Sequence, residues 1–103
     1  MPIKKQYLKT RDVCKVTFRI PETTAIKARE AAVVGDFNRW DAGANPMKKL
    51  KTDGSFKTVV ELPKNGEYAF RYLVDGREWL NEPEADRSAP TPYPDARNSL
   101  IQT

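Results

Sequence analysis

Trp40 and Trp79 both stand among polar residues rather than in apolar runs. An exposed indole offers a rigid, flat apolar surface of about 200 Å² at a low cost in conformational entropy. Because a hexose ring has apolar C–H faces and a hydroxylated rim, two such indoles would suit stacking against sugars. The alternative is that both side chains anchor the core or a loop, since tryptophan is usually largely buried.

A sugar site also needs donors and acceptors for the ring hydroxyls. Arg71, Asn98 and Tyr93 supply these groups, and Arg71 falls on the face of its segment opposite the apolar pattern. Taken singly, Arg71 and Asn98 are better interpreted as a solvated charge and a turn amide than as binding residues.

The elements that would position these side chains are short strands. Asp53-Gly54, Asn65-Gly66 and Asp75-Gly76 recur at short intervals, and each pair favours the positive-φ conformations of tight hairpins. The segments around them alternate between apolar and polar residues with a period of two. This pattern predicts an all-β sandwich of about seven short antiparallel strands. The clearest strands are 16–20, 55–62, 67–74 and 99–102.

Two regions leave a choice of structure. Residues 24–32 contain good helix formers, but the apolar run that ends at Gly35 favours a loop followed by a strand from about 28 to 34. The segment 82–95 holds four prolines and is predicted to be a long, stiff loop. We divide the chain into a basic N-terminal arm, residues 1–12, and one domain, residues 13–103.

The composition argues against an enzyme. The chain has no histidine and one cysteine, Cys14, which removes the commonest general base and most zinc sites. No glycine-rich phosphate loop is present, so we expect no cofactor and no metal. Carboxylates are available, but a lone sandwich of this length offers little material for the cleft of a glycosidase.

Charge and cysteine usage bear on partners and location. The net charge of +4 raises the question of nucleic acid, but basic and acidic residues are interspersed, so a solvated arm is favoured over a phosphate-binding patch. A single cysteine and the lack of a long apolar segment predict a cytoplasmic protein that neither binds nor crosses a membrane.

Three separated motifs resemble one family in sequence order. VVGDFNRWD (33–41), LPKNGEYAFRYLVDGREW (62–79) and RNSLI (97–101) are similar to the signature of the family-48 carbohydrate-binding modules. This family includes the N-terminal early-set domains of isoamylases and branching enzymes, and the glycogen-binding module of the AMP-activated protein kinase β subunit. The likeness covers about 70 residues and leaves 1–12 outside it.

The resemblance implies an immunoglobulin-like early-set sandwich that binds α-1,4-glucan chains of the glycogen or starch type without catalysis. By position in the motifs, Trp40 and Trp79 would be the stacking platforms, Arg71 and Asn98 would contact hydroxyls, and Tyr93 would take the place of an inserted apolar residue. A glycogen-metabolising enzyme or a kinase-like complex is the protein partner that the family suggests. The alternative is an early-set adaptor module that has lost sugar binding and docks on proteins instead.

Overall fold

The structure is a computed structural model that describes residues 3–24, 28–83, 85–91 and 97–103. Within these residues it contains nine strands and one short 3₁₀ turn, with no α-helix. None of the described segments is a helix long and apolar enough to cross a bilayer. In chain order the elements are β1 (Ile3–Tyr7), β2 (Val13–Ile20), β3 (Ala31–Gly35), η1 (Asp36–Asn38), β4 (Pro46–Lys49), β5 (Phe56–Pro63), β6 (Glu67–Val74), β7 (Glu78–Leu80), β8 (Arg87–Pro90) and β9 (Arg97–Gln102).

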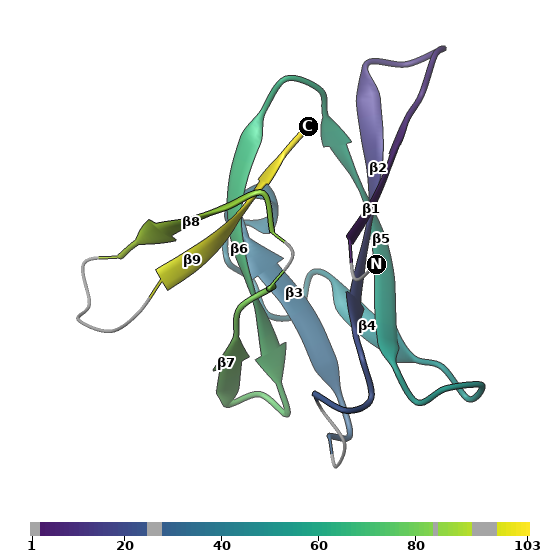
Figure 1. The fold of residues 1–103 in the computed structure, drawn as a ribbon, viewed down its shortest axis with the longest axis vertical. Coiled ribbons are helices and arrows are strands. Elements are labelled where there is room, and N and C mark those ends of the chain that lie inside the picture. The colour runs from purple at the N-terminus through teal and green to yellow at the C-terminus, as the bar shows by residue number, and fades with distance from the viewer. Residues whose placement is uncertain (1–2, 25–27, 84, 92–96) are drawn as a thin grey trace.

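The strands form two antiparallel layers that lie side by side in Figure 1. Sheet A has the order β1-β2-β5-β4, and sheet B has the order β3-β6-β9-β8, with β7 also paired to β6. Strand β4 pairs with β5 through its second half and with β3 through its first, so it joins the two layers. The predicted all-β sandwich is therefore confirmed.

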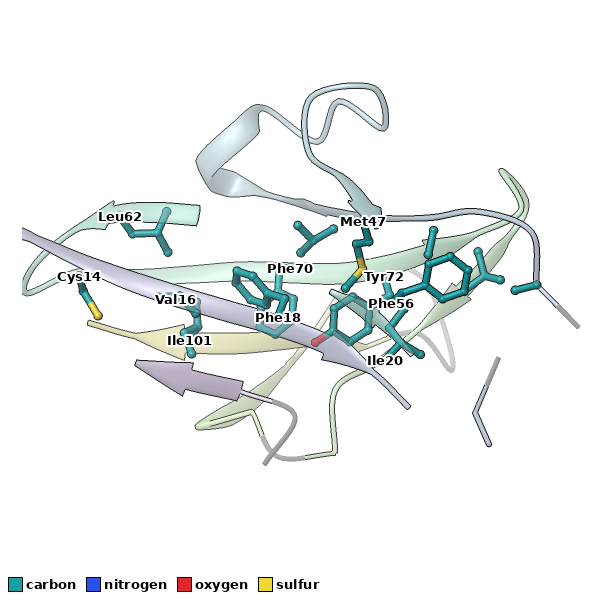
Figure 2. Close-up of a cluster of buried hydrophobic side chains, with 14 residues drawn as sticks. Cys14, Val16, Phe18, Ile20, Met47, Phe56, Leu62, Phe70, Tyr72 and Ile101 are labelled. Atoms are coloured by element: carbon teal, nitrogen blue, oxygen red, sulfur yellow. The ribbon is translucent and has the colours of Figure 1, made fainter. Parts of the chain in front are cut away.

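The core lies between the layers and is filled by alternate residues of the long strands (Figure 2). Strand β2 alternates without a break between half-buried and buried residues, as the period-two pattern predicts. Phe18 is central, because its ring contacts those of Phe37, Phe70 and Tyr72 at centroid distances of 5.0–6.4 Å. The other labelled members of the cluster are Cys14, Val16, Ile20, Met47, Phe56, Leu62 and Ile101.

The helix-prone region before Gly35 ends in a strand, as favoured from the sequence. Every residue of β3 is buried, and the strand pairs with β4 on one side and with β6 on the other. Burial on both faces outweighs the helix propensity of its alanines. Gly35 ends the strand where it passes so close to Ala69 and Phe70 that a Cβ atom would collide with both.

The three predicted turns have two different roles. Asp53-Gly54 joins the antiparallel pair β4–β5, and Asp75-Gly76 joins β6–β7, so both belong to hairpins. Asn65-Gly66 instead connects β5 in sheet A to β6 in sheet B, and these two strands do not pair. The prediction of a tight hairpin is wrong there, because β6 crosses to the other layer, where its Phe70 and Tyr72 pack against Phe18 of β2.

The described residues form nine strands, compared with about seven predicted, and four short ones, β1, β4, β7 and β8, lie outside the clearest predicted segments. Strand β8 lies inside the region predicted to be a loop; its Pro90 is tolerated because β8 is an edge strand. Residues 3–7, predicted to be a solvated arm, form β1 and pair with β2 along their whole length. The division of the chain at residue 12 stays a prediction.

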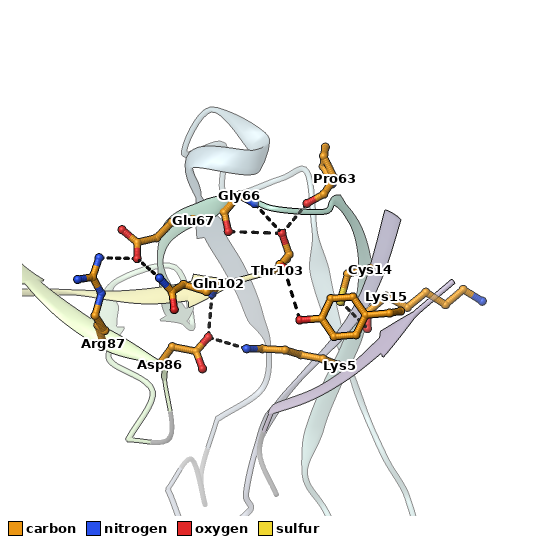
Figure 3. A network of polar contacts seen from close by, with 11 residues as sticks. Lys5, Cys14, Lys15, Pro63, Gly66, Glu67, Asp86, Arg87, Gln102 and Thr103 are labelled. Atoms are coloured by element: carbon orange, nitrogen blue, oxygen red, sulfur yellow. Dashed lines mark hydrogen bonds and ion pairs between the residues drawn. The ribbon is translucent and has the colours of Figure 1, made fainter. Parts of the chain in front are cut away.

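A polar network joins β1 to the far end of sheet B (Figure 3). The ammonium group of Lys5 lies 2.7 Å from Asp86, which also accepts a hydrogen bond of 2.8 Å from the backbone amide of Gln102. Partial burial opposes the charged form of Asp86, but the Gln102 amide and Lys5 outweigh it and lower the pKa of this carboxyl. We call this contact between Lys5, Asp86 and Gln102 the polar seam.

Candidate functional site

The candidate site lies on the side of sheet B that faces away from the core. Residues that pair directly across antiparallel strands share a face, and alternate residues of one strand return to it. Ala32 and Val34 of β3 therefore lie beside Leu73 and Arg71 of β6, while Phe70 and Tyr72 point into the core. We call this side the outer face of sheet B.

Arg71 and Asn98 meet at the centre of this face. Strand β3 pairs with one edge of β6, and β9 and β7 share the other. Strand β9 pairs with the first half of this second edge, up to Phe70↔Ser99, and β7 pairs with the second half, from Tyr72↔Leu80. Arg71 lies between these two registers. Its Nε donates a hydrogen bond of 2.7 Å to Oδ1 of Asn98, and both residues are partly buried. Since one nitrogen is engaged in this bond, the fork of the guanidinium is held in one orientation with two Nη groups left as donors.

Trp79, on β7, lies on the same face, and its cross-strand partner on β6 is two residues beyond Arg71. It pairs with Leu73 in the β6–β7 hairpin, and 47% of its surface is exposed. Asp75 and Gly76 both have positive φ, and the amide of Arg77 donates to the carbonyl of Val74 at 3.2 Å, which are the features of a type I′ turn. Three residues, 75–77, separate the paired Val74 and Glu78, and this register places the indole on the outer face.

Contacts at both ends of β7 hold this hairpin in place. At the turn, Oδ1 of Asp75 accepts hydrogen bonds from the backbone amides of Glu30 and Arg29, which lower the pKa of the carboxyl. Beyond the strand, Glu82 is buried and accepts a hydrogen bond of 2.7 Å from the hydroxyl of Tyr72. Burial, followed by this carboxylate, raises the pKa of Tyr72 far above its ordinary value, so the phenol keeps its proton and its donor role.

Trp40 is presented by a tight turn at the end of β3. Both Arg39 and Trp40 have left-handed backbone conformations, with φ near 57° and 58°, which is uncommon for residues other than glycine. The amide of Trp40 donates to the carbonyl of Gly35 at 2.9 Å, and 37% of the residue is exposed. Phe37, in the same turn, is partly buried and packs against the core, whereas the indole of Trp40 lies at the surface.

Two polar residues that were not predicted as site residues position Trp40. Oδ1 of Asp36 accepts a hydrogen bond of 2.9 Å from the indole Nε1, while its Oδ2 accepts one from the amide of Ala69 on β6. Asn38 accepts from the amide of Gly35 and donates to the carbonyl of Val33 at 3.0 Å. Both lie inside the motif 33–41, and two carboxamide or carboxylate side chains in a tight turn were the signal.

The structure brings the predicted residues together to different extents. Arg71, Asn98 and Trp79 share the outer face of sheet B, and Asp36 ties Trp40 to the Ala69 end of β6. Ala69 and Leu73 are four residues apart, so the anchor points of the two tryptophans are separated by roughly 14 Å along the strand. Tyr93 lies outside the described residues.

Chemically, this face combines apolar planes with fixed donors and acceptors. Among the described residues, no three histidine, cysteine, aspartate or glutamate side chains are grouped so that they could hold a metal ion. The carboxylates near the face serve the chain itself: Asp36 binds the indole, Asp75 caps a loop and Glu82 accepts from Tyr72. The arrangement is suited to non-covalent recognition of a ligand with flat apolar faces and a polar rim.

The sandwich therefore carries two exposed indoles outside its core. A family model matches residues 12–88, which is more than half of the chain, so this chain belongs to the carbohydrate-binding module 48 family, also described as the isoamylase N-terminal domain. The resemblance drawn from the three motifs is confirmed. Modules of this family are non-catalytic and serve to bind glycans.

Two curated relatives are 1,4-α-glucan branching enzymes. That of Halothermothrix orenii is 35% identical over 51 residues, which cover 48% of this chain and 8% of the enzyme. That of Pseudomonas fluorescens is 34% identical over 65 residues, which cover 63% of this chain and 9% of the enzyme. The chain thus spans less than a tenth of the length of these relatives.

Solved structures confirm the fold at low sequence identity. The ferric enterobactin esterase of Salmonella typhimurium superposes with a TM-score of 0.75 at 12% identity, covering 99% of this chain and 34% of the esterase. The esterase of Shigella flexneri gives a TM-score of 0.72 at 11% identity, covering 99% and 32%. At such identities the likeness concerns the architecture alone.

Proposed function

We propose that this chain is a non-catalytic module that binds α-1,4-glucan chains of the glycogen or starch type through the outer face of sheet B. The observation that carries the proposal is the common placement of Arg71, Asn98 and Trp79 on the outer face of sheet B, with Trp40 fixed at one end of that face. The names of the two branching enzymes point to 1,4-linked glucan as the substrate class.

In this mechanism the two indoles stack on the apolar faces of separate glucose units of one chain. Arg71 donates to hydroxyls between them, and Asn98 both orients the guanidinium and supplies its amide. The anchor points lie roughly 14 Å apart, so one oligosaccharide must span both platforms. Burial of two indole faces stabilises the complex by several kcal/mol at about 25 cal/mol per Å².

Binding is expected to be weak. Immobilising a flexible oligosaccharide and removing water from its hydroxyls offset much of the stacking energy. We therefore expect dissociation constants between about 1 μM and 1 mM, or roughly −8 to −4 kcal/mol. A cytoplasmic location and association with a glycogen-metabolising enzyme or a kinase-like complex belong to the same proposal.

The test is affinity electrophoresis in gels that contain glycogen, together with a maltoheptaose titration followed by tryptophan fluorescence. Glycogen should retard the unaltered chain, and Trp40→Ala should migrate as it does in a gel without glycogen. Val59→Ser, on the opposite sheet, is the matched control and should be retarded normally. Absence of retardation, or equal retardation of Trp40→Ala and the unaltered chain, would refute the proposal.

A further inference from the structure

The side of sheet A that faces away from the core carries a different set of residues. The cross-strand pairs Lys4↔Thr17, Thr17↔Val59 and Lys48↔Lys57 lie on this side, as does Lys15. We call it the outer face of sheet A. It is directed away from sheet B, so a ligand on one outer face leaves the other free (Figure 1).

The positive charge of this face is concentrated on lysines. Among the described residues, Lys4, Lys15, Lys48 and Lys57 form no ion pair. The two acidic side chains near them are already engaged, because Asp53 pairs with Arg19 at 2.7 Å and Glu61 pairs with Arg11 at 2.8 Å. The hydroxyl and amide of Ser55, helped by Arg19, hold the pKa of Asp53 at about 2, so the pair with Arg19 persists at neutral pH.

This arrangement works against stability. Lys48 and Lys57 are direct neighbours across β4 and β5, and Lys57 also pairs with Arg19 across β5 and β2. Like charges directly opposite each other destabilise a sheet. Places where a sequence departs from a local rule of stability are often functional.

The lysines surround an apolar centre. Val59 is 50% exposed, with Thr17 opposite it and Lys57 next but one along its strand. A shallow hollow of about 260 Å³ lies here, lined by Lys4, Gln6, Lys15, Thr17, Lys57 and Val59. An apolar centre with a polar rim is the usual anatomy of a protein interface.

We propose that the outer face of sheet A docks an acidic segment of a protein partner, with Val59 contacting an apolar side chain in the middle of that segment. The four lysines attract its carboxylates over a longer range and set the rate of association. Within the described residues the face offers no aromatic ring on which a base could stack, and its arginine is held by Asp53, which disfavours nucleic acid. The proposal is independent of glucan binding.

Two ten-residue peptides test it: one of glutamates only, and one with leucine at its two central positions. Each is titrated into the ¹⁵N-labelled chain at about 50 mM salt, where charge interactions are weakly screened. We expect amide shifts in β1, β2 and β5, and about threefold tighter binding of the leucine peptide. Raising the salt to about 300 mM should weaken both peptides.

Three variants separate the contributions. Lys15→Gln with Lys57→Gln should weaken both peptides about tenfold, whereas Val59→Ser should abolish only the preference for leucine. Lys9→Gln with Lys51→Gln removes the same charge elsewhere and should leave both affinities unchanged. Equal losses in the two double variants, no preference for leucine, or tighter binding of a single-stranded oligonucleotide of equal charge would overturn the proposal. The probes carry no sugar, so a failure here leaves glucan binding untouched.

Discussion

The outer faces of the two sheets are built on the same alternation of residues but have opposite characters. Sheet B presents an arginine, an asparagine and an indole beside small residues such as Ala32, whereas sheet A presents lysines around one exposed valine. Their inward residues belong to one shared core. The comparison teaches that in strands such as β2 packing dictates only every second residue, so the remaining residues are free to carry separate functions.

The two faces also differ in how far their polar groups are ordered in advance. Arg71 is bonded to Asn98, and the indole of Trp40 is bonded to Asp36, so sheet B offers donors and planes in fixed positions. The four lysines on the outer face of sheet A, Lys4, Lys15, Lys48 and Lys57, form no ion pair among the described residues. We therefore expect recognition on sheet B to depend on short-range geometry, and recognition on sheet A to depend on charge and hence on salt.

The largest expected effect tests whether the sugar binds to sheet B rather than to sheet A, and it comes from removing the central donor of sheet B. Arg71→Ala should weaken maltoheptaose about 10- to 100-fold, because hydrogen bonds from charged groups contribute about 1.5–3 kcal/mol. The affinity of Arg71→Lys for maltoheptaose should lie between those of Arg71→Ala and the unaltered chain. The lysine ammonium keeps a donor but lacks the guanidinium fork that is bonded to Asn98. Calorimetric titration at two salt concentrations checks both values. If Lys57→Gln on sheet A weakened the sugar as much, the assignment of faces would be wrong.

The next largest effect concerns the support of Trp40. Asp36→Ala removes the acceptor of the indole Nε1 and of the Ala69 amide, so it should destabilise the fold by about 1–2 kcal/mol and weaken glycogen binding. Denaturant unfolding and the wavelength of tryptophan emission measure the two effects. Asp41→Ala, which loses a turn bond to the amide of Gly43 instead, is the matched control and should leave the emission in place. Identical spectra for both variants would contradict a positioning role for Asp36.

A third prediction concerns the polar seam, which links the two sheets and should contribute to the stability of the fold. Asp86→Asn should lower the stability at pH 7 by about 1 kcal/mol through loss of the ion pair with Lys5. The native pKa of Asp86 lies below its ordinary value of 3.8, so the unfolded chain binds the proton first as the pH falls. The carboxylate's contribution is therefore complete above pH 3.8 and is lost as the pH falls through the lowered value.

Thermal unfolding of both proteins between about pH 7 and pH 2 measures this dependence. The difference in stability between Asp86→Asn and the unaltered chain should shrink across the acidic end of the series. Lys5→Gln should resemble Asp86→Asn at pH 7. A difference that stayed constant down to the lowest pH would show that the charge of Asp86 does not contribute.

The smallest expected effect is a gain in stability on sheet A. Lys48→Glu replaces a repulsive cross-strand pair with Lys57 by an attractive one, so it should stabilise the fold by about 0.5 kcal/mol. Denaturant titration checks the value, and Lys51→Glu, in the turn that follows β4, is the control of equal charge. A gain of the same size in the control would mean that net charge, rather than this pair, limits stability.

The sequence predicts those elements whose evidence is local. Alternation located β2, β5 and β6, and burial on both faces explains why the run before Gly35 is a strand despite its helix formers. The outward direction of Arg71 follows from the same alternation. Strands as short as β4, β7 and β8 carry too little pattern, and their pairing is set by neighbours far away in the chain.

Long-range contacts also explain what was missed at the site. Asp36 appears in the sequence as an ordinary turn residue, and its role depends on Ala69, 33 positions away. Lys5 appears as part of a charged arm until its contact with Asp86, 81 positions away, is known. The family motifs singled out Trp40 and Trp79 as candidate site residues. The contacts that hold these two residues could be identified only from the folded chain.

Strand β4 pairs with strands of both layers, so the two layers are connected differently on the two sides of the sandwich. On its own side a backbone ladder runs from one layer into the next through Met47 and Lys48, whereas the side of β1 and β9 is closed by side chains such as those of the polar seam. Backbone ladders yield later than exposed ion pairs. We therefore expect the two layers to separate first on the side of β1 and β9, with exposure of Cys14 and Ile101 before Met47.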